Sequence, residues 1–291
     1  MSSVLYRYSM VTKPGIVIGN TLALVTGYVF ALLEGSGAFN WRTFLGSVIG
    51  TAWVMGSACV YNNLLDRDID GIMERTKSRA FVTGSIPPLH GALYSIVLLY
   101  IGVYILSQEL PPLAAYLALA AWALYAICYT HLKRYSYYAA LVGSIPGSAP
   151  PVIGYIVAGG QSLGSALILF AIVVCWQMMH FYAIALMRKA EYAAASIPVI
   201  SVVKGEIVTR RHIEWWSWML SVALIISTAF APLPYALVAA ALSMWLLHYV
   251  GHANASREAR TIFRLSLRFL LLWMGAVTLS LMVASAINLM S

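Results

Sequence analysis

The stretch 62–79, "NNLLDRDIDGIMERTKSR", follows directly on a run of apolar residues long enough to cross a membrane. Charged side chains crowd into it, among them Asp66, Asp68, Asp70, Glu74, Arg75, Lys77 and Arg79. Only 10% of the chain is charged, so much of its charge is concentrated here. Any account of fold and function has to explain these residues at the edge of an apolar segment.

The composition indicates an integral membrane protein built from helices. Of the 291 residues, 61% are hydrophobic, whereas a soluble domain has about 45–50% apolar residues. A helix needs about 20 apolar residues to cross a bilayer. Nine stretches approach that length: 14–33, 43–62, 89–107, 110–130, 138–158, 164–187, 214–231, 234–250 and 265–287. We therefore predict an all-α bundle of about nine transmembrane helices, with residues 1–291 as one domain.

The basic residues indicate how the bundle is oriented. If the loops alternate between the two sides, 17 of the 18 Lys and Arg residues fall on one side and only Arg42 on the other. Because basic residues accumulate in cytoplasmic loops, we expect a cell-membrane protein with its N-terminus in the cytoplasm and its C-terminus outside. The net charge of +8 then reflects topology and attraction to anionic membrane lipid. It does not call for nucleic-acid binding.

The three cysteines, Cys59, Cys128 and Cys175, lie inside predicted spans at unrelated spacings. We expect them to be small buried hydrophobic residues. Their spacing forms no metal motif, and a disulfide framework is not indicated.

The charged stretch has a regular spacing if it continues a helix. Asn62, Asp66 and Asp70 are spaced i, i+4, i+8 and so lie on one stripe, whereas Asp68 points elsewhere. One carboxamide and two carboxylates supply the oxygen ligands that Mg²⁺ prefers, and Mg²⁺ commonly shares itself with substrate phosphates. Arg75 and Arg79 follow, and guanidinium groups bind phosphate through paired hydrogen bonds. The pattern predicts a magnesium–diphosphate site, although a solvated loop with ordinary positive-inside residues is a simpler interpretation.

Besides 62–88, two further loops on the same side carry polar residues, 131–137 and 188–213. "YTHLKR" at 129–134 places Lys133 and Arg134 just past the fourth span, which alone is an ordinary topology signal. The following segment, "GSIPGSAPPVIGY" at 143–155, is rich in glycine and proline and should thin and kink the fifth helix. Such a segment either packs closely against another helix or leaves room for a flat ligand.

The sixth span carries a polar and aromatic patch. Trp176 and His180 are four residues apart, with Gln177 on the same face and Phe181 beside it. A histidine inside a membrane helix usually faces the bundle interior, where it makes a structural hydrogen bond or contacts a ligand. After the span comes Glu191, a candidate for a second metal-binding corner opposite the aspartates.

These residues resemble the UbiA superfamily of intramembrane prenyltransferases. "NNLLDRDIDGIMERTKSR" is similar to the superfamily's first aspartate-rich motif, with Thr76 among the matching residues. "YTHLKR", "GSAPPVIGY", "WQMMHF" and "EYAAASIPVISVVKG" resemble further motifs of the branch that prenylates haem, in the same order over about 60–212. The "WQMMHF" block, with its histidine, is what points to that branch.

The resemblance implies a UbiA-type fold and transfer of a farnesyl group from farnesyl diphosphate to a vinyl group of haem b, with addition of water. It implies Mg²⁺ held by Asn62, Asp66, Asp70 and Glu191, which would be the catalytic residues. It further implies that the substrates contact Arg75, Thr76, Arg79, Lys133, Arg134, Trp176, Gln177, His180, Phe181 and Lys204. A haem A synthase or a terminal oxidase assembly is the partner that such an activity suggests.

The chain departs from the branch's pattern at three positions. Glu191 stands where an aspartate is common, Ser196 where a glycine is common, and Ala139 where an asparagine is usual. These differences affect the metal geometry and one polar contact.

Three other functions fit parts of the pattern. A prenyltransferase of the same superfamily could act on another aromatic or lipid acceptor, and a haem requirement would separate the two. A transporter needs a polar route to both faces, but the loops on the other side carry almost no basic residues. A haem-binding anchor would not need the aspartates.

Overall fold

The computed structural model describes residues 2–108, 110–255 and 258–290. In these ranges the chain forms helices and connecting loops, and nine helical segments are long and apolar enough to cross a membrane. They are Pro14–Glu34, Trp41–Leu65, Pro88–Ser107, Pro112–Leu132, Ala139–Val157, Leu163–Met187, Gly205–Phe230, Leu233–Asn254 and Ala259–Ile287. The predicted all-α membrane bundle is confirmed, and each span overlaps its predicted stretch.

Individual helices subdivide these spans and the loops. In chain order they are α1 (Ser2–Val11), α2 (Pro14–Glu34), α3 (Trp41–Leu65), α4 (Arg67–Ile72), α5 (Pro88–Ser107), α6 (Pro112–Ala123), the π-helix η1 (Leu124–Tyr129), α7 (Thr130–Leu132), α8 (Ala139–Gly147), α9 (Ala149–Val157), α10 (Leu163–Met187), α11 (Lys189–Ala194), α12 (Ile200–Val203), α13 (Gly205–Ser227), the 3₁₀ turn η2 (Thr228–Phe230), α14 (Leu233–Ala255) and α15 (Ala259–Met290).

The seventh span begins nine residues earlier than the predicted 214. Its first turns are charged, and Arg210 pairs with Glu206 one helical turn away, with Nη2 and Oε1 2.8 Å apart. Hydrophobicity alone therefore underestimates this helix. The ninth span, α15, likewise starts at Ala259, before the predicted start at 265.

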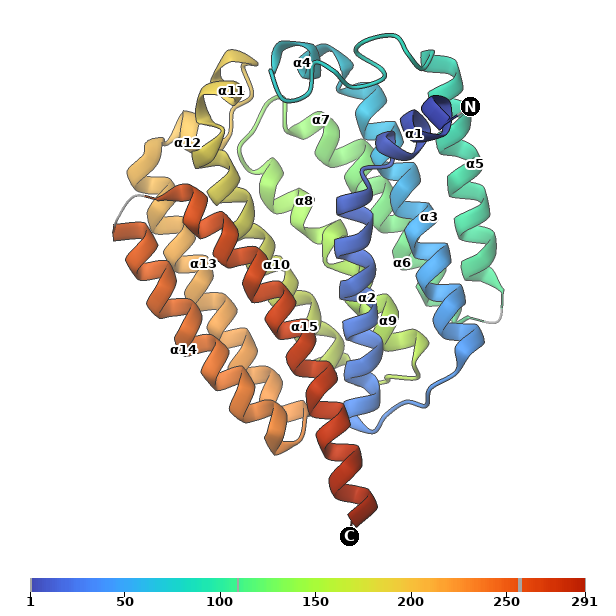
Figure 1. The fold of residues 1–291 in the computed structure, drawn as a ribbon, viewed down its shortest axis with the longest axis vertical. Helices are drawn as coiled ribbons and strands as arrows, with labels where there is room; N and C mark the ends of the chain where they lie inside the picture. The colour runs from blue at the N-terminus through green and yellow to red at the C-terminus, as the bar shows by residue number, and fades with distance from the viewer. Residues whose placement is uncertain (1, 109, 256–257, 291) are drawn as a thin grey trace.

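The helices pack in a closed ring. Neighbours follow the chain from α2 through α3, α5 and α6 to α8–α9, α10, α13 and α14, and α15 closes the ring against α2. Figure 1 shows α15, in red, beside the blue α2. Chain ends that are far apart in sequence thus form one wall, and α15 also packs against α10.

Glycines permit the close approach of α2 and α9. A Cβ on Gly27 of α2 would lie 1.8 Å from the carbonyl oxygen of Pro151 in α9. A Cβ on Gly154 of α9 would lie 2.0 Å from the carbonyl oxygen of Leu24. Small residues at such contacts let backbones touch, which is how helices associate in lipid.

The predicted kink in the fifth span is confirmed. The helix breaks at Ser148, between α8 and α9, with Pro146 before the break and Pro150 after it. Each proline lacks the N–H that a continuous helix would use.

Two predictions for cysteines are confirmed and one is wrong: Cys59 and Cys175 are buried, but Cys128 is exposed because it lies on the outer face of η1.

The polar loops gather at one end of the bundle. Figure 1 shows α1, α4, α7, α11 and α12 together at that end, with the C-terminus of α15 at the other. The loops 62–88, 131–137 and 188–213 are therefore neighbours in space, as their common polarity predicts. Arg257, which contributes to the basic side in the sequence, lies outside the described residues.

Candidate functional site

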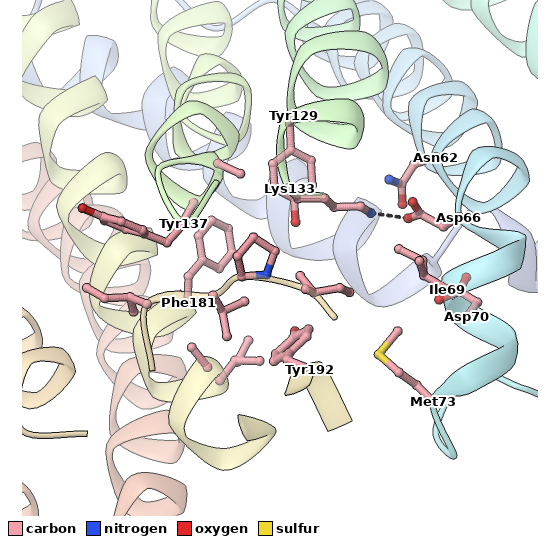
Figure 2. A pocket seen from close by; sticks show the side chains of 18 of the residues that line it. Asn62, Asp66, Ile69, Asp70, Met73, Tyr129, Lys133, Tyr137, Phe181 and Tyr192 are labelled. Carbon is pink, nitrogen blue, oxygen red and sulfur yellow. Dashed lines mark hydrogen bonds and ion pairs between the residues drawn. The ribbon is translucent and has the colours of Figure 1, made fainter. Parts of the chain in front are cut away.

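A polar cavity of about 270 Å³ lies among the helix ends at this end of the bundle. It is lined by residues of α2, α3, α4, η1, α8, α10, α11 and α12 and of the loops between them. Figure 2 shows Asp66 and Asp70 on one wall, with Lys133 reaching across toward Asp66. We call this space the polar cavity.

The acidic stripe has the geometry that its spacing predicts. α3 ends just before Asp66 and α4 begins just after it. The backbone N–H of Asp66 nevertheless donates to the Asn62 carbonyl (3.0 Å), and that of Asp70 donates to the Asp66 carbonyl (2.8 Å). The helical repeat therefore continues across the break. All three side chains are buried, at 2–3% exposure, and all three line the polar cavity.

Each residue of the stripe meets one cation. Lys13 donates to Oδ1 of Asn62 and Lys133 to Oδ2 of Asp66. Arg79 donates from Nη1 to Oδ2 of Asp70 at 2.6 Å. Charges buried this deeply need such partners.

The cavity as a whole favours a polyanion. Among the described residues that line it, four are cations and two are carboxylates: Lys13, Arg75, Arg79, Lys133, Asp66 and Asp70. Burial lowers the pKa of Lys13 to about 8, and it also lowers the pKa of Lys133 while Asp66 opposes that shift. Both ammonium groups lose hydration on burial, so a phosphate entering the cavity would gain strong charge-assisted hydrogen bonds.

The orientation of the Asn62 amide follows from its neighbours. Its Nδ2 donates to Oγ1 of Thr130 at 2.9 Å, and that hydroxyl donates to the Tyr125 carbonyl at 2.9 Å. The hydroxyl proton is thereby used, so Oγ1 accepts from Asn62. The amide oxygen is left facing Lys13 and the cavity.

Two carboxylate oxygens near the cavity are buried without a hydrogen-bond partner: Oδ1 of Asp66 and Oε2 of Glu191. The described residues contain no group of three or more His, Cys, Asp or Glu side chains close enough to hold a metal by themselves. Mg²⁺ is usually bound through one or two carboxylates together with substrate phosphates. The unpartnered oxygen of Asp66, beside Asp70 and the Asn62 amide oxygen, fits that mode of binding.

Four residues predicted for the site lie beside the polar cavity and do not line it. Thr76 is buried and donates to the Asp70 carbonyl at 2.9 Å. Arg134 donates to Oδ2 of Asp68 at 2.6 Å, which lowers the pKa of Asp68 to about 2. Lys204 lies 5.7 Å from the ring centre of Tyr137. These three side chains hold the loops in place around the cavity.

Glu191 is the fourth. It accepts a hydrogen bond from Arg188 at 2.7 Å, and its other oxygen is 3.9 Å from Nε of Arg75. Through Arg75, which does line the cavity, Glu191 connects α11 to the loop after α4.

Two of the departures from the resemblance have structural counterparts. Ser196 has φ +55°, a left-handed conformation that glycine adopts without strain. This explains why glycine suits the position. Ala139 is buried and lines the polar cavity, so the short side chain leaves space there.

Sequence reasoning missed several residues of the polar cavity. Lys13 counted only as a topology signal, because nothing local connects it to Asn62, 49 residues later. A signal was present in Lys13-Pro14: proline favours the first position of a helix, so the lysine is held at the mouth of the first span. Tyr125 and Tyr129 were also missed, and their rings stack at 5.3 Å.

A second, mostly apolar space of about 350 Å³ lies deeper in the bundle. We call it the apolar chamber. Trp176, Gln177 and His180 of α10 line it, as their common helix face predicts. Phe181 lines both spaces, as do Ile16, Tyr125 and Tyr129.

The glycine-rich fifth span forms one side of the apolar chamber. A Cβ on Gly147 would lie 2.3 Å from Oε1 of Gln177, and one on Gly143 would lie 2.7 Å from the Tyr129 ring. Ser148 holds Gln177 in place, because Nε2 of Gln177 donates a hydrogen bond to Oγ of Ser148 at 3.2 Å. The small residues therefore make room for the side chains that line the chamber.

Comparison with known proteins agrees with this arrangement. Residues 23–274 match the UbiA prenyltransferase family. A protoheme IX farnesyltransferase of Yersinia enterocolitica is 41% identical over 268 residues, which cover 90% of each chain. One of Aeromonas salmonicida is 41% identical over 269 residues, again covering 90% of each chain.

Solved structures with little sequence identity share the fold. A digeranylgeranylglyceryl phosphate synthase superimposes with a TM-score of 0.75 at 15% identity, covering 96% of this chain and 97% of that one. A UbiA homologue from Archaeoglobus fulgidus bound to GPP and Mg²⁺ has a TM-score of 0.67 at 14% identity, covering 94% and 99%. The sequence match, the nine spans and this common fold lead to one assignment: the chain belongs to the UbiA prenyltransferase family.

Proposed function

We propose that this membrane prenyltransferase transfers the farnesyl group of farnesyl diphosphate to a vinyl group of haem b, with addition of water, giving haem O and diphosphate. The observation that carries the proposal is the junction between the polar cavity and the apolar chamber, where Tyr125, Tyr129 and Phe181 line both. A diphosphate held on one side of this junction places its isoprenoid carbons on the other. The 41% identity to protoheme IX farnesyltransferases supports haem b as the acceptor.

The bonds and charges balance as follows. The allylic carbon–oxygen bond of farnesyl diphosphate breaks, and its electron pair leaves with the diphosphate. The vinyl group supplies the electron pair of the new carbon–carbon bond. Water adds to the remaining carbon of the vinyl group and loses a proton, which leaves the hydroxyl group of the product.

The residues of the polar cavity would bind and stabilise the departing diphosphate. Arg75, Arg79 and Lys133 provide donors aimed at the place where negative charge develops. Mg²⁺ held through Asn62, Asp66 and Asp70, which line the polar cavity, would neutralise part of that charge when bound. The related structure from Archaeoglobus fulgidus bound to GPP and Mg²⁺ supports this assignment.

The residues at the junction would protect the positive charge on the allylic carbons. Tyr125 and Tyr129 offer aromatic faces, which attract a cation within about 6 Å of the ring centre. Lys133 lies 5.4 Å from the ring centre of Tyr129, between the ring and Asp66. The apolar chamber would keep bulk water away until the acceptor has reacted.

We further propose the setting in which the enzyme works. The chain acts as a single domain in the cell membrane, with the polar cavity and the N-terminus on the cytoplasmic side and the C-terminus outside. The one-sided distribution of basic residues supports this orientation. A haem A synthase or terminal oxidase assembly would receive the product. A UbiA-type enzyme that prenylates another aromatic or lipid acceptor is the second candidate function.

Product analysis tests the proposal. The purified protein in liposomes is incubated with haem b, farnesyl diphosphate and Mg²⁺, and the extract is analysed by mass spectrometry. We expect a hydroxyfarnesylated haem from the natural protein and none from Asp66→Asn. Prenylation of other acceptors, with haem b left unchanged, would support the second candidate and reject haem.

Lys13→Gln is expected to raise the KM for farnesyl diphosphate by about tenfold, since a hydrogen bond to a charged group contributes about 1.5–3 kcal/mol. Steady-state kinetics in liposomes measures this. Lys77→Gln is the matched control, because Lys77 is exposed and pairs with the neighbouring Glu74 at 2.6 Å. Equal KM values for the two variants would remove Lys13 from the diphosphate site.

A further inference from the structure

Ser266 of α15 is completely buried and makes two contacts with the polar patch of α10. Its Oγ lies 2.7 Å from Nδ1 of His180, and its backbone carbonyl accepts a hydrogen bond from Nε1 of Trp176 at 2.7 Å. Ser266 is 86 residues from His180 in sequence. The two helices meet where α15 closes the ring, so one serine holds two of the α10 side chains that line the apolar chamber.

The hydrogen bonds determine which nitrogen of His180 carries the proton. Oγ of Ser266 donates its single proton to the carbonyl of Phe263, at 2.7 Å. A hydroxyl has one donor, so toward His180 the same oxygen can only accept. Nδ1 therefore carries the hydrogen in the neutral imidazole, and Nε2 has the free lone pair.

Aromatic rings fix the plane of the imidazole. The Trp176 ring stacks on it at 5.1 Å with an interplanar angle of 17°, and the Phe263 ring lies 4.9 Å away at 30°. The two rings restrict the orientation of the imidazole, while the side chain still lines the apolar chamber. Within residues 2–108, 110–255 and 258–290, the hydrogen bond of His180 is made at Nδ1, and Nε2 has no partner there.

We propose that Ser266 is a positioning residue that holds His180 in this tautomer and orientation, so that Nε2 ligates the iron of the haem acceptor. The inference rests on the proposed function, since it takes haem b as the acceptor. A histidine ligand that donates its other N–H to a nearby oxygen is fixed in orientation and is more basic. An axial bond to iron would hold the porphyrin in one position, which decides which vinyl group faces the junction at Tyr125 and Tyr129.

Haem titration of the full-length protein in detergent tests the proposal, followed by absorption and electron paramagnetic resonance spectra. Ser266→Ala is expected to weaken haem b binding by about 10–100-fold and to alter the spectrum of the histidine-ligated iron. Ser266→Thr keeps the hydroxyl and should restore that spectrum. His180→Gly should lose the signature and regain it when imidazole is added.

Two further measurements separate folding from ligation. Ser280→Ala changes another buried serine of α15 and should leave the haem spectrum as in the natural protein. Farnesyl diphosphate binding should remain within about twofold in Ser266→Ala, because Ser266 does not line the polar cavity. A variant that binds the diphosphate is folded, so its haem spectrum can be interpreted.

The outcomes are distinguishable. A natural haem spectrum in Ser266→Ala, with the signature lost in His180→Gly, would overturn the role of Ser266 alone. An unchanged spectrum in His180→Gly would overturn iron ligation by His180. If the natural protein binds farnesyl diphosphate but no haem b, the proposed acceptor itself is wrong, and this inference is lost with it.

Discussion

Asp66→Asn is expected to lower kcat/KM for farnesyl diphosphate by about 1,000-fold, the upper range for removing one group that stabilises transition-state charge. Asp66 has the unpartnered oxygen in the acidic stripe, and its other oxygen holds Lys133. The amide keeps the size of the side chain but removes the charge, so both metal binding and the position of Lys133 are affected. Single-turnover kinetics with saturating Mg²⁺ separates the chemical step from diphosphate binding.

Asp68→Asn is the matched control for this experiment. Asp68 is two residues away but lies on another face of the helix, where its side chain is 60% exposed and pairs with Arg134. Exposed ion pairs contribute about 0–1 kcal/mol, so activity should change by less than about fivefold. If both variants lose activity equally, the cause is the folding of the loop, and the stripe has no special role.

Gly27→Ala is expected to destabilise the bundle by at least about 3 kcal/mol, because overpacking a close contact costs about 1–3 kcal/mol even where side chains can move. Here the added methyl group would meet the backbone oxygen of Pro151 at 1.8 Å, and backbone moves less easily. The α2 and α9 helices would have to separate, which would open the apolar chamber that both of them line. Chemical denaturation in detergent, followed by tryptophan fluorescence, measures the change.

Gly275→Ala is the control for this variant. Gly275 also lies inside a membrane helix, and a Cβ there meets no atom within 4 Å. Alanine favours a helix by about 1 kcal/mol relative to glycine, so stability should stay the same or rise slightly. Equal destabilisation of the two variants would mean that helix propensity, and not the contact with Pro151, decides the cost.

The sequence was sufficient to predict the fold to the level of the nine spans. The hydrophobicity of about 20 consecutive residues reflects the free energy of transferring that segment from water into the bilayer. This free energy depends only on the segment itself. The start of the seventh span was missed, since Glu206 and Arg210 belong to a helix that extends beyond the apolar region. Which helices pack side by side, such as α15 against α2, depends on contacts between distant parts of the chain.

In the candidate site too, residues related by a local pattern could be predicted, whereas contacts between distant parts of the chain could not. The stripe of Asn62, Asp66 and Asp70 follows from the helical repeat within one segment, and the structure shows it as predicted. Contacts across the bundle, such as Lys13 with Asn62, could not be predicted because no local pattern connects the two residues. Thr76, Arg134 and Lys204 were placed in the site by resemblance, and Glu191 was first suggested by its place after the sixth span. In the structure all four hold surrounding loops. Substrate contact by the first three and metal binding by Glu191 stay predictions.

The π-helix η1 carries one extra residue in the fourth span without changing the phase of the helix that follows. Its i→i+5 hydrogen bonds take one more residue per turn than the i→i+4 bonds of an α-helix. Removing one residue from Leu124–Tyr129 would therefore regularise the helix and leave Lys133 facing Asp66. What would change is the widened turn itself, which carries Tyr125 and Tyr129 at the junction of the two spaces. A gap of one residue here in a related sequence would mark an altered junction beside an unaltered polar cavity.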